Sequence, residues 1–324
     1  MTPLSARKLI RNSFIGFSAL AIFAAPSALA EKYASIVVDM DSNEVLHARH
    51  ADAPRYPASL TKVMTLYMLF DALKAGEVRL DEKLKVSRNA SRQPPSSLRL
   101  KTGSTITVSN AIDALVTKSA NDVAVVVAER LGGTEKRFAT LMTAKARSMG
   151  MTRTTFRNAS GLPDNQQLST ARDMAILAER VLEDHAAYYG YFAETKFSWG
   201  RNTYRNHNRL IGQVDGVDGI KTGYTRASGF NLMTSAKRRG RRVVTIMFGG
   251  STARSRDQHV TDLVEAAYAS FKDSPTDPRL RARIQFSNVQ PPLEPNGAAM
   301  PVLNGQVFSG SPVIAEGDEG SKSD

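Results

Sequence analysis

The chain has 324 residues, of which 42% are hydrophobic, enough for one large domain or two medium domains with a substantial core. It contains no cysteine, which excludes disulfides, thiolate catalysis and cysteine-based zinc sites. The formal net charge of +12 at pH 7 favours anionic partners. The five histidines are scattered, and we interpret His47 and His50 as exposed strand and loop residues, so we predict no metal and no other cofactor.

The first 30 residues have the pattern of a secretory signal. Arg7, Lys8 and Arg11 precede a 12-residue apolar run, residues 14–25, and Ala28-Leu29-Ala30 then forms an A-x-A-like cleavage site. Because this run is too short to span a bilayer, we predict export with cleavage after Ala30. Removing the three charges leaves 40 basic against 31 acidic residues, a net charge of +9. Cell-wall polymer or lipid headgroups are then better candidate partners than nucleic acid.

After this segment the chain begins with a predicted hairpin. Residues 33–40 and 44–47 read as two strands, and the polar Asp41-Ser42-Asn43 between them favours a turn. The apolar run at residues 63–70 then predicts a helix that is hydrophobic on nearly every face and ends near Gly76. Such a helix is expected to lie buried at the centre of the fold.

The next hundred residues are predicted to be mostly helical. They open with a polar stretch, residues 77–110, in which Pro94-Pro95 excludes regular structure, so loops and short strands are expected there. Apolar spacing and capping residues then predict four helices: around residues 112–116, at 123–131, at 138–149, and one capped by residues 169–173 that extends to 182.

From residue 216 the pattern changes to strands, expected at residues 217–222, 230–236 and 243–248. The basic residues 237–242 join the last two, and we interpret them as a solvated hairpin turn rather than an anion site. A final helix is predicted over residues 260–271. Strands at both ends with helices between them predict an α+β fold in which one antiparallel sheet includes the N-terminal hairpin.

Residues 272–324 differ in composition from the rest of the chain. They carry seven of the 14 prolines and end in an acidic, glycine-rich segment. We predict a largely disordered tail over residues 273–324, without the apolar face or basic stripe of a membrane-anchoring helix.

The strongest chemical signal is Ser59-Leu60-Thr61-Lys62, just before the buried helix. A hydroxyl and an amine three residues apart at a helix start lie within reach of each other, and the positive end of the helix favours an oxyanion nearby. Taken alone, the pattern also fits an ordinary helix cap. Two more motifs follow in chain order, Ser119-Ala120-Asn121 and Lys221-Thr222-Gly223. The three together are typical of penicillin-binding proteins and class A β-lactamases.

With these motifs the chain resembles the serine-type D-alanyl-D-alanine carboxypeptidases, also known as low-molecular-mass penicillin-binding proteins. The similarity extends from about Tyr33 to Phe271 and is closest in four stretches: residues 57–65, 118–122, 158–162 and 218–225. It implies a transpeptidase-like fold with an antiparallel sheet flanked by helices and a helical lobe beside it. Residues 31–272 are then expected to form the catalytic domain.

The motif residues can be given roles on this basis. Ser59 is the predicted nucleophile, which forms an acyl-enzyme with the penultimate D-alanine, releases the terminal D-alanine and is freed by water. Lys62 is the predicted base, because burial and the charge of Lys221 can lower its pKa. Ser119 is predicted to relay a proton to the leaving nitrogen, and Asn121 to hydrogen-bond the substrate amide.

Substrate binding is assigned to the third motif. Lys221 and Thr222 are predicted to hold the terminal carboxylate, and Gly223 to leave room for substrate along the strand edge. By resemblance, the oxyanion hole consists of the backbone N–H groups of Ser59 and Tyr224. Arg256 is a further candidate for binding the carboxylate. An equally good interpretation is that Arg256 is an ordinary surface arginine.

A second copy of the third motif, Lys101-Thr102-Gly103, lies in the polar, proline-containing region before Ser119. We assign catalysis to Lys221-Thr222-Gly223, because it follows the other two motifs and ends an alternating strand.

Three other activities are weighed against the carboxypeptidase. A class A β-lactamase needs a glutamate in an E-x-x-L-N pattern, and the nearest match, residues 179–183, ends in Glu. An endopeptidase that cuts peptidoglycan cross-links would share every catalytic residue. A wall-binding protein without turnover is the third. We predict a soluble periplasmic enzyme acting on peptidoglycan stem peptides and acylated by β-lactams, with no nucleic-acid partner and no integral membrane anchor.

Overall fold

The computed structural model describes residues 32–271. The predicted signal peptide, residues 1–30, and the predicted tail, residues 273–324, lie outside the described residues. Within residues 32–271, no helix is long and apolar enough to cross a membrane.

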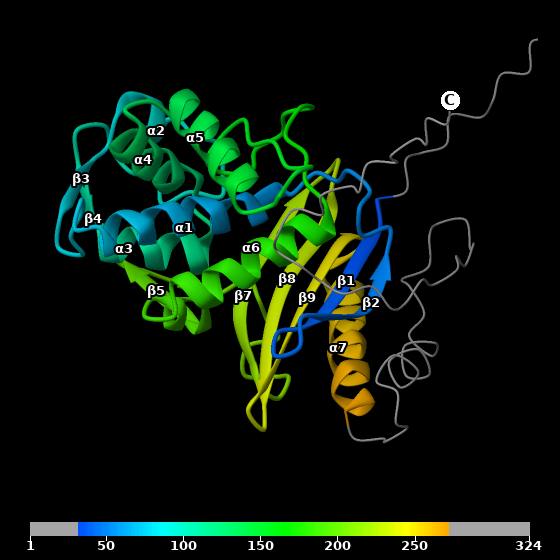
Figure 1. Cartoon of the computed structure of the whole chain (residues 1–324). Helices are drawn as coiled ribbons and strands as arrows, with labels where there is room; N and C mark the ends of the chain where they lie inside the picture. The colour runs from blue at the N-terminus through cyan, green and yellow to red at the C-terminus, as the bar shows by residue number, and fades with distance from the viewer. Residues whose placement is uncertain (1–31, 272–324) are drawn as a thin grey trace, which may run out of the picture. The chain divides into compact units, whose positions relative to one another are not determined.

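A five-stranded antiparallel sheet forms one half of the described fold, and Figure 1 shows its strands side by side. The strand order is β2-β1-β9-β8-β7, which places the N-terminal hairpin beside the later strands and confirms the predicted sheet. The strands are β1 (Ala34–Asp39), β2 (Glu44–Arg49), β7 (Val217–Thr225), β8 (Gly229–Arg238) and β9 (Arg241–Gly250). Because β7 is an edge strand, one side of its backbone faces the helical lobe rather than another strand.

Helices cover both faces of this sheet (Figure 1). On β1 and β9, Ile36 and Ile246 belong to the cluster that includes the buried residues of α6 (Ala171–Asp184), whereas Val37 and Met247 belong to the cluster of α7 (Ala253–Ser270). This alternation follows from the period of two along a strand, which sends neighbouring side chains to opposite faces. The sheet is therefore buried on both faces.

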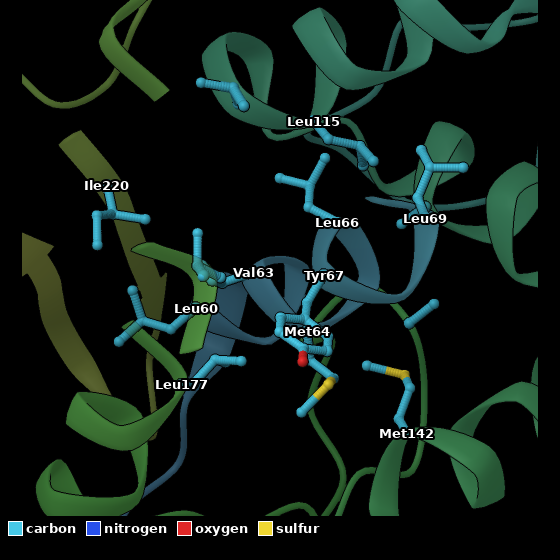
Figure 2. Close-up of a cluster of buried hydrophobic side chains, with 14 of the residues drawn as sticks. Leu60, Val63, Met64, Leu66, Tyr67, Leu69, Leu115, Met142, Leu177 and Ile220 are labelled. Carbon is cyan, nitrogen blue, oxygen red and sulfur yellow. The ribbon is translucent and has the colours of Figure 1, made fainter. Parts of the chain in front are cut away.

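The helical lobe is built around α1 (Thr61–Lys74), which follows a single 3₁₀ turn, Ala58–Leu60. Ten of its residues are buried, so the predicted central helix is confirmed. Figure 2 shows side chains of the turn and α1 meeting Leu115, Met142, Leu177 and Ile220, which come from four other parts of the chain. This packing holds the start of α1, and with it Ser59, in place.

The remaining described elements are short or belong to the lobe. They are β3 (Lys83–Lys85), α2 (Arg88–Ser91), β4 (Thr105–Thr107), α3 (Val108–Asp113), a π-helical turn (Ala114–Lys118), α4 (Asn121–Gly132), α5 (Glu135–Ser148), a 3₁₀ turn (Tyr189–Ala193), β5 (Lys196–Trp199) and β6 (Asn202–Arg205). The polar stretch before α3 thus contains the short strands that its composition predicts. The β5–β6 hairpin was not predicted, because short strands with so many polar residues carry little hydrophobic signal.

Two local predictions were wrong. The last helix begins at Ala253, not near residue 260, because Thr252 and Ser255 form a reciprocal capping box there. His47 is buried rather than exposed, with Nε2 2.9 Å from the Ser35 hydroxyl. Burial, followed by the influence of His259 and Arg49, lowers the pKa of His47 to about 3, so the ring is a neutral part of the core.

Candidate active site

Ser59 lies in the 3₁₀ turn before α1, in a backbone that its neighbours hold in a strained form. Ala58 has φ of 47°, a left-handed conformation that costs a non-glycine residue free energy. A Cβ on Gly161 would lie 1.8 Å from the Ala58 carbonyl oxygen, so the loop at Gly161 packs backbone to backbone against this turn. Only glycine fits there, and the contact holds the backbone of the turn that carries Ser59.

Lys62 is fully buried beneath Ser59. Its Nζ lies 3.0 Å from Ser59 Oγ, 2.8 Å from Asn121 Oδ1 and 2.5 Å from the Ser160 carbonyl oxygen. Burial, and then the positive charge of Lys221, lower its pKa well below the usual lysine value, with Asp122 opposing the shift. A lysine held in this way is poised to lose its proton.

The three partners of Lys62 are not equivalent once the amine is neutral. Asn121 Oδ1 and the Ser160 carbonyl can only accept hydrogen bonds, whereas the Ser59 hydroxyl can also donate one. Two N–H groups of the neutral amine can serve the two acceptors, which leaves the lone pair directed at Ser59. The hydrogen-bond pattern therefore makes Ser59 the group whose proton Lys62 can take.

The second motif is held in place by a neighbouring loop. Asp122 accepts hydrogen bonds from the backbone N–H groups of Leu98 and Leu100 at 3.1 Å each, and Asn121 Nδ2 donates to the Pro94 carbonyl at 2.9 Å. These contacts attach the polar loop around Pro94 to the start of α4. Asn121 thus contacts Lys62 with its amide oxygen and this loop with its amide nitrogen. The sequence did not predict these loop contacts of Asn121 and Asp122.

Ser119 occupies a backbone position that aims its side chain at the cleft. Its φ is 57°, directly after the π-helical turn, and its side chain lines the same cavity as Ser59. Among the described residues, its buried Oγ has no hydrogen-bond partner. Since buried hydroxyls are normally paired, this one is available to a bound molecule.

The third motif runs along the edge strand β7, directly beside Ser59. A Cβ on Gly223 would lie 3.0 Å from the Ser59 backbone nitrogen and 3.1 Å from the Pro57 carbonyl oxygen, so the strand passes in close contact with the turn that carries Ser59. Lys221 is buried, with Nζ 3.1 Å from the Thr222 carbonyl oxygen. Burial and then the charge of Arg256 lower the pKa of Lys221 to about 7.

Arg256 and Tyr224 also line the cleft. Arg256 is only 3% exposed, so it is not the surface arginine of the alternative prediction. It donates to the Asn231 carbonyl at 3.2 Å and pairs with Asp257 at 2.7 Å, which holds the guanidinium against β8. Tyr224 is 56% exposed, and its ring packs on Phe230 with centroids 4.2 Å apart.

A cleft of about 770 Å³ joins these residues. Eight of the nine predicted site residues either line it or, as with Lys221, lie directly behind its wall; Lys62 is buried below Ser59. Sequence reasoning missed one wall, formed by the end of β6 and the residues after it, among them Arg205, His207 and Arg209. The second Lys-Thr-Gly copy, Lys101 to Gly103, is exposed and does not line the cleft.

Comparison with known proteins agrees with this geometry. The family model for D-alanyl-D-alanine carboxypeptidases of peptidase family S11 matches residues 22–252. The chain is 32% identical over 289 residues to D-alanyl-D-alanine carboxypeptidase DacF of Bacillus subtilis, covering 83% of this chain and 73% of that protein.

Solved structures show the same relationship. The crystal structure of D-alanyl-D-alanine carboxypeptidase DacD from Francisella tularensis is similar with a TM-score of 0.71 at 27% identity, covering 82% of this chain and 74% of that one. Ampicillin-bound penicillin-binding protein D2 from Listeria monocytogenes has a TM-score of 0.66 at 30% identity, covering 72% and 95%. The chain therefore belongs to the D-alanyl-D-alanine carboxypeptidase family and is a serine peptidase with the fold of penicillin-binding proteins.

Proposed function

We propose that this serine peptidase removes the terminal D-alanine from peptidoglycan stem pentapeptides through an acyl-enzyme on Ser59. The observation that carries the proposal is the contact set of Lys62, in which Ser59 is the one partner with a proton to give. Ser59 Oγ adds to the carbonyl carbon of the penultimate D-alanine while Lys62 takes the hydroxyl proton.

The two halves of the reaction use the same groups. The C–N bond breaks, and the departing D-alanine nitrogen receives a proton that passes from Lys62 through Ser119. Water then adds to the ester carbonyl while Lys62 accepts a proton from that water. The C–O bond to Ser59 breaks, Lys62 returns the proton to Ser59 Oγ, and the shortened peptide leaves with the hydroxyl and the neutral amine restored. The unpaired Ser119 Oγ at the cleft wall supports this relay role.

Substrate is held against the edge of the sheet. A peptide laid along β7 adds a strand there, and Gly223 lets it approach the backbone. Lys221, Thr222 and the buried Arg256 form a positive end for the terminal carboxylate. The N–H groups of Ser59 and Tyr224 stabilise the oxyanion, and Asn121 keeps one amide hydrogen for the substrate beyond the one it gives to Pro94.

β-Lactams are proposed to acylate Ser59 in the same way, as the ampicillin-bound relative suggests. Rapid release of the drug would need a base for water, and Glu179, the nearest match to the β-lactamase glutamate, does not line the cleft. Its side chain borders a separate cavity beside Met40 and Arg242. We therefore favour a penicillin-binding carboxypeptidase over a β-lactamase, exported by the signal sequence to the periplasm.

The test is D-alanine release from diacetyl-L-Lys-D-Ala-D-Ala. Wild-type protein should release it, and Ser59→Ala and Lys62→Met should each lose at least about a thousandfold in rate, because the nucleophile and its base act as a unit. Lys101→Met, which removes an exposed lysine outside the cleft, is the matched control. Release that persists in Ser59→Ala would refute the assignment. A cross-linked D-alanyl dimer cut faster than the tripeptide would favour the endopeptidase instead.

A further inference from the structure

One wall of the cleft is cationic and carries a set of residues that the proposed reaction does not use. Arg205, His207 and Arg209, which we call the cationic strip, line the cleft together with Arg256. No aspartate or glutamate occurs among the described residues that line it. The volume of about 770 Å³ lies in the upper part of the usual range for ligand sites, roughly 300–1,000 Å³, so there is room beyond a D-alanyl-D-alanine end.

The backbone of the strip is anchored by the residues between its members. Asn206 donates from its side chain to the Glu194 carbonyl at 2.7 Å, and Asn208 donates to the Gly219 carbonyl on β7 at 3.0 Å. Asn208 is 2% exposed. These two contacts hold the segment between Arg205 and Arg209 in place, and all three members of the strip line the cleft on this fixed backbone.

The hairpin that carries the strip is also fastened to the second motif. Tyr204, next to Arg205, has its ring 4.7 Å from the Nζ of Lys118, the residue before Ser119. Its cross-strand neighbour Phe197 is buried in the core of the lobe. The strip therefore cannot drift away from the catalytic groups without breaking this packing.

The charges of the strip have no carboxylate to balance them. No ion pair joins Arg205 or Arg209 to any described residue, whereas Arg256 behind them pairs with Asp257. Arg205 lies directly across the hairpin from Lys196, and like charges in such a pair repel. The charge of Arg209 also acts on Arg256, since together with burial it lowers the pKa of that guanidinium. An anionic ligand would relieve this repulsion.

Building on the proposed function, we propose that the cationic strip binds a second carboxylate of the substrate, one carried by the part of the stem peptide that precedes D-alanyl-D-alanine. Lys221 and Arg256 serve the terminal carboxylate, so Arg205 and Arg209 remain for another anion on the same chain. His207 is neutral at pH 7, because desolvation in the cleft and the nearby lysines and Arg256 lower its pKa to about 4, and it contributes a hydrogen bond rather than charge. The substrate class is a dicarboxylic acyl-D-alanyl-D-alanine peptide.

The experiment compares kcat/KM for D-alanine release from matched peptides. One pair has acetylated diaminopimelate before D-alanyl-D-alanine, with its side-chain carboxylate either free or converted to the carboxamide. A third peptide has lysine at that position and a γ-linked glutamate, with a free α-carboxylate, before it. We expect wild-type protein to prefer a free carboxylate about tenfold, from charge-assisted contacts in a partly exposed site. The preferred peptide identifies which carboxylate is bound.

The arginine variants test whether the strip causes the preference. Arg205→Gln with Arg209→Gln should bring the carboxylate-to-carboxamide ratio close to one, and Arg205→Glu should favour a peptide with a free lysine ammonium. Arg201→Gln, which removes the same charge from the exposed hairpin turn, should keep the wild-type ratio.

Equal rates for all peptides with wild-type protein, or a ratio lost equally in Arg201→Gln, would overturn the inference. Failure of the proposed function would look different, because wild-type protein would then release D-alanine from none of the peptides, and both proposals would fall.

Discussion

The chain contains the tripeptide Lys-Thr-Gly twice, and the two copies have almost nothing in common beyond their letters. Lys101, Thr102 and Gly103 are exposed in a turn, with Gly103 at φ of 81° and open space around it. Lys221, Thr222 and Gly223 are buried on the edge strand β7, in contact with the turn that carries Ser59. The comparison indicates that the tripeptide alone does not make a binding site. The lowered pKa of Lys221 results from its burial, and Gly223 leaves room for substrate because it lies beside Ser59.

The largest difference is expected when the two lysines are replaced. Lys221→Met should lower kcat/KM for the D-alanyl-D-alanine peptide by about a thousandfold, because a substrate carboxylate would then be buried without its charged partner. Lys101→Met should stay within about twofold, as an exposed residue outside the cleft. Steady-state kinetics of the two purified variants decide it, and a comparable loss in both would contradict the assignment of the third motif.

Replacing the two glycines should separate crowding from backbone strain. Gly223→Ala places a methyl group about 3.0 Å from the Ser59 nitrogen, and a small shift of the nucleophile should reduce acylation roughly a hundredfold. Gly103→Ala meets no neighbour but is forced into a left-handed conformation, which costs about 1–2 kcal/mol. Its acylation rate should match wild type while its Tm falls. An unchanged rate in Gly223→Ala would mean that β7 is not tightly packed on Ser59.

The two buried lysines predict a bell-shaped pH dependence. Acylation needs neutral Lys62, so kcat/KM should rise as pH increases through the lowered pKa of that residue. Carboxylate binding needs charged Lys221, whose pKa is about 7, so kcat/KM should fall roughly tenfold by about pH 8. Lys221→Arg keeps its charge and should lose the alkaline fall, whereas Lys101→Met should retain it. A fall that survives in Lys221→Arg would show that another group titrates.

The smallest effect concerns stability. The pKa of Lys221 is lower in the folded state than the unfolded value of about 10.5, so the unfolded chain binds more protons between pH 7 and 10.5. The burial cost is therefore full below pH 7 and is relieved as pH rises. Lys221→Met removes this cost and should raise Tm by a few degrees at pH 6, with a smaller gain at pH 9. Lys101→Met should change Tm by about 1 °C or less at either pH. A lower Tm for Lys221→Met at pH 6 would contradict this account.

Much of the fold could be predicted from the sequence, because its signals are local or periodic. The alternating strands, the helix that is apolar on every face and Gly76 at its end correspond directly to β1, β8, β9 and α1. The order of the three motifs and the choice between the two Lys-Thr-Gly copies also followed from strand pattern and position, and the S11 family match confirms the resemblance.

Other parts of the site depend on contacts that no local pattern encodes. The Ser160 carbonyl acts on Lys62 through its backbone, and Asp122 binds backbone N–H groups in a loop that is distant in sequence. Arg256 is buried in the first turn of α7, where it contacts the Asn231 carbonyl of β8. Arg205 ends a polar hairpin that carries no hydrophobic signal, and His207 and Arg209 follow it. Their place on the cleft wall depends on the contacts of Asn206 and Asn208 with distant backbone carbonyls.

The central claim is that Ser59 is the nucleophile of a site assembled from the three motifs. It is tested most directly by incubating the protein with benzylpenicillin, following the intact mass over time and mapping the modified peptide. We predict a long-lived adduct of one drug molecule on the peptide containing Ser59, absent in Ser59→Ala and present in Lys101→Met. No adduct, an adduct on another serine such as Ser119, or a transient adduct with rapid drug hydrolysis would contradict the account.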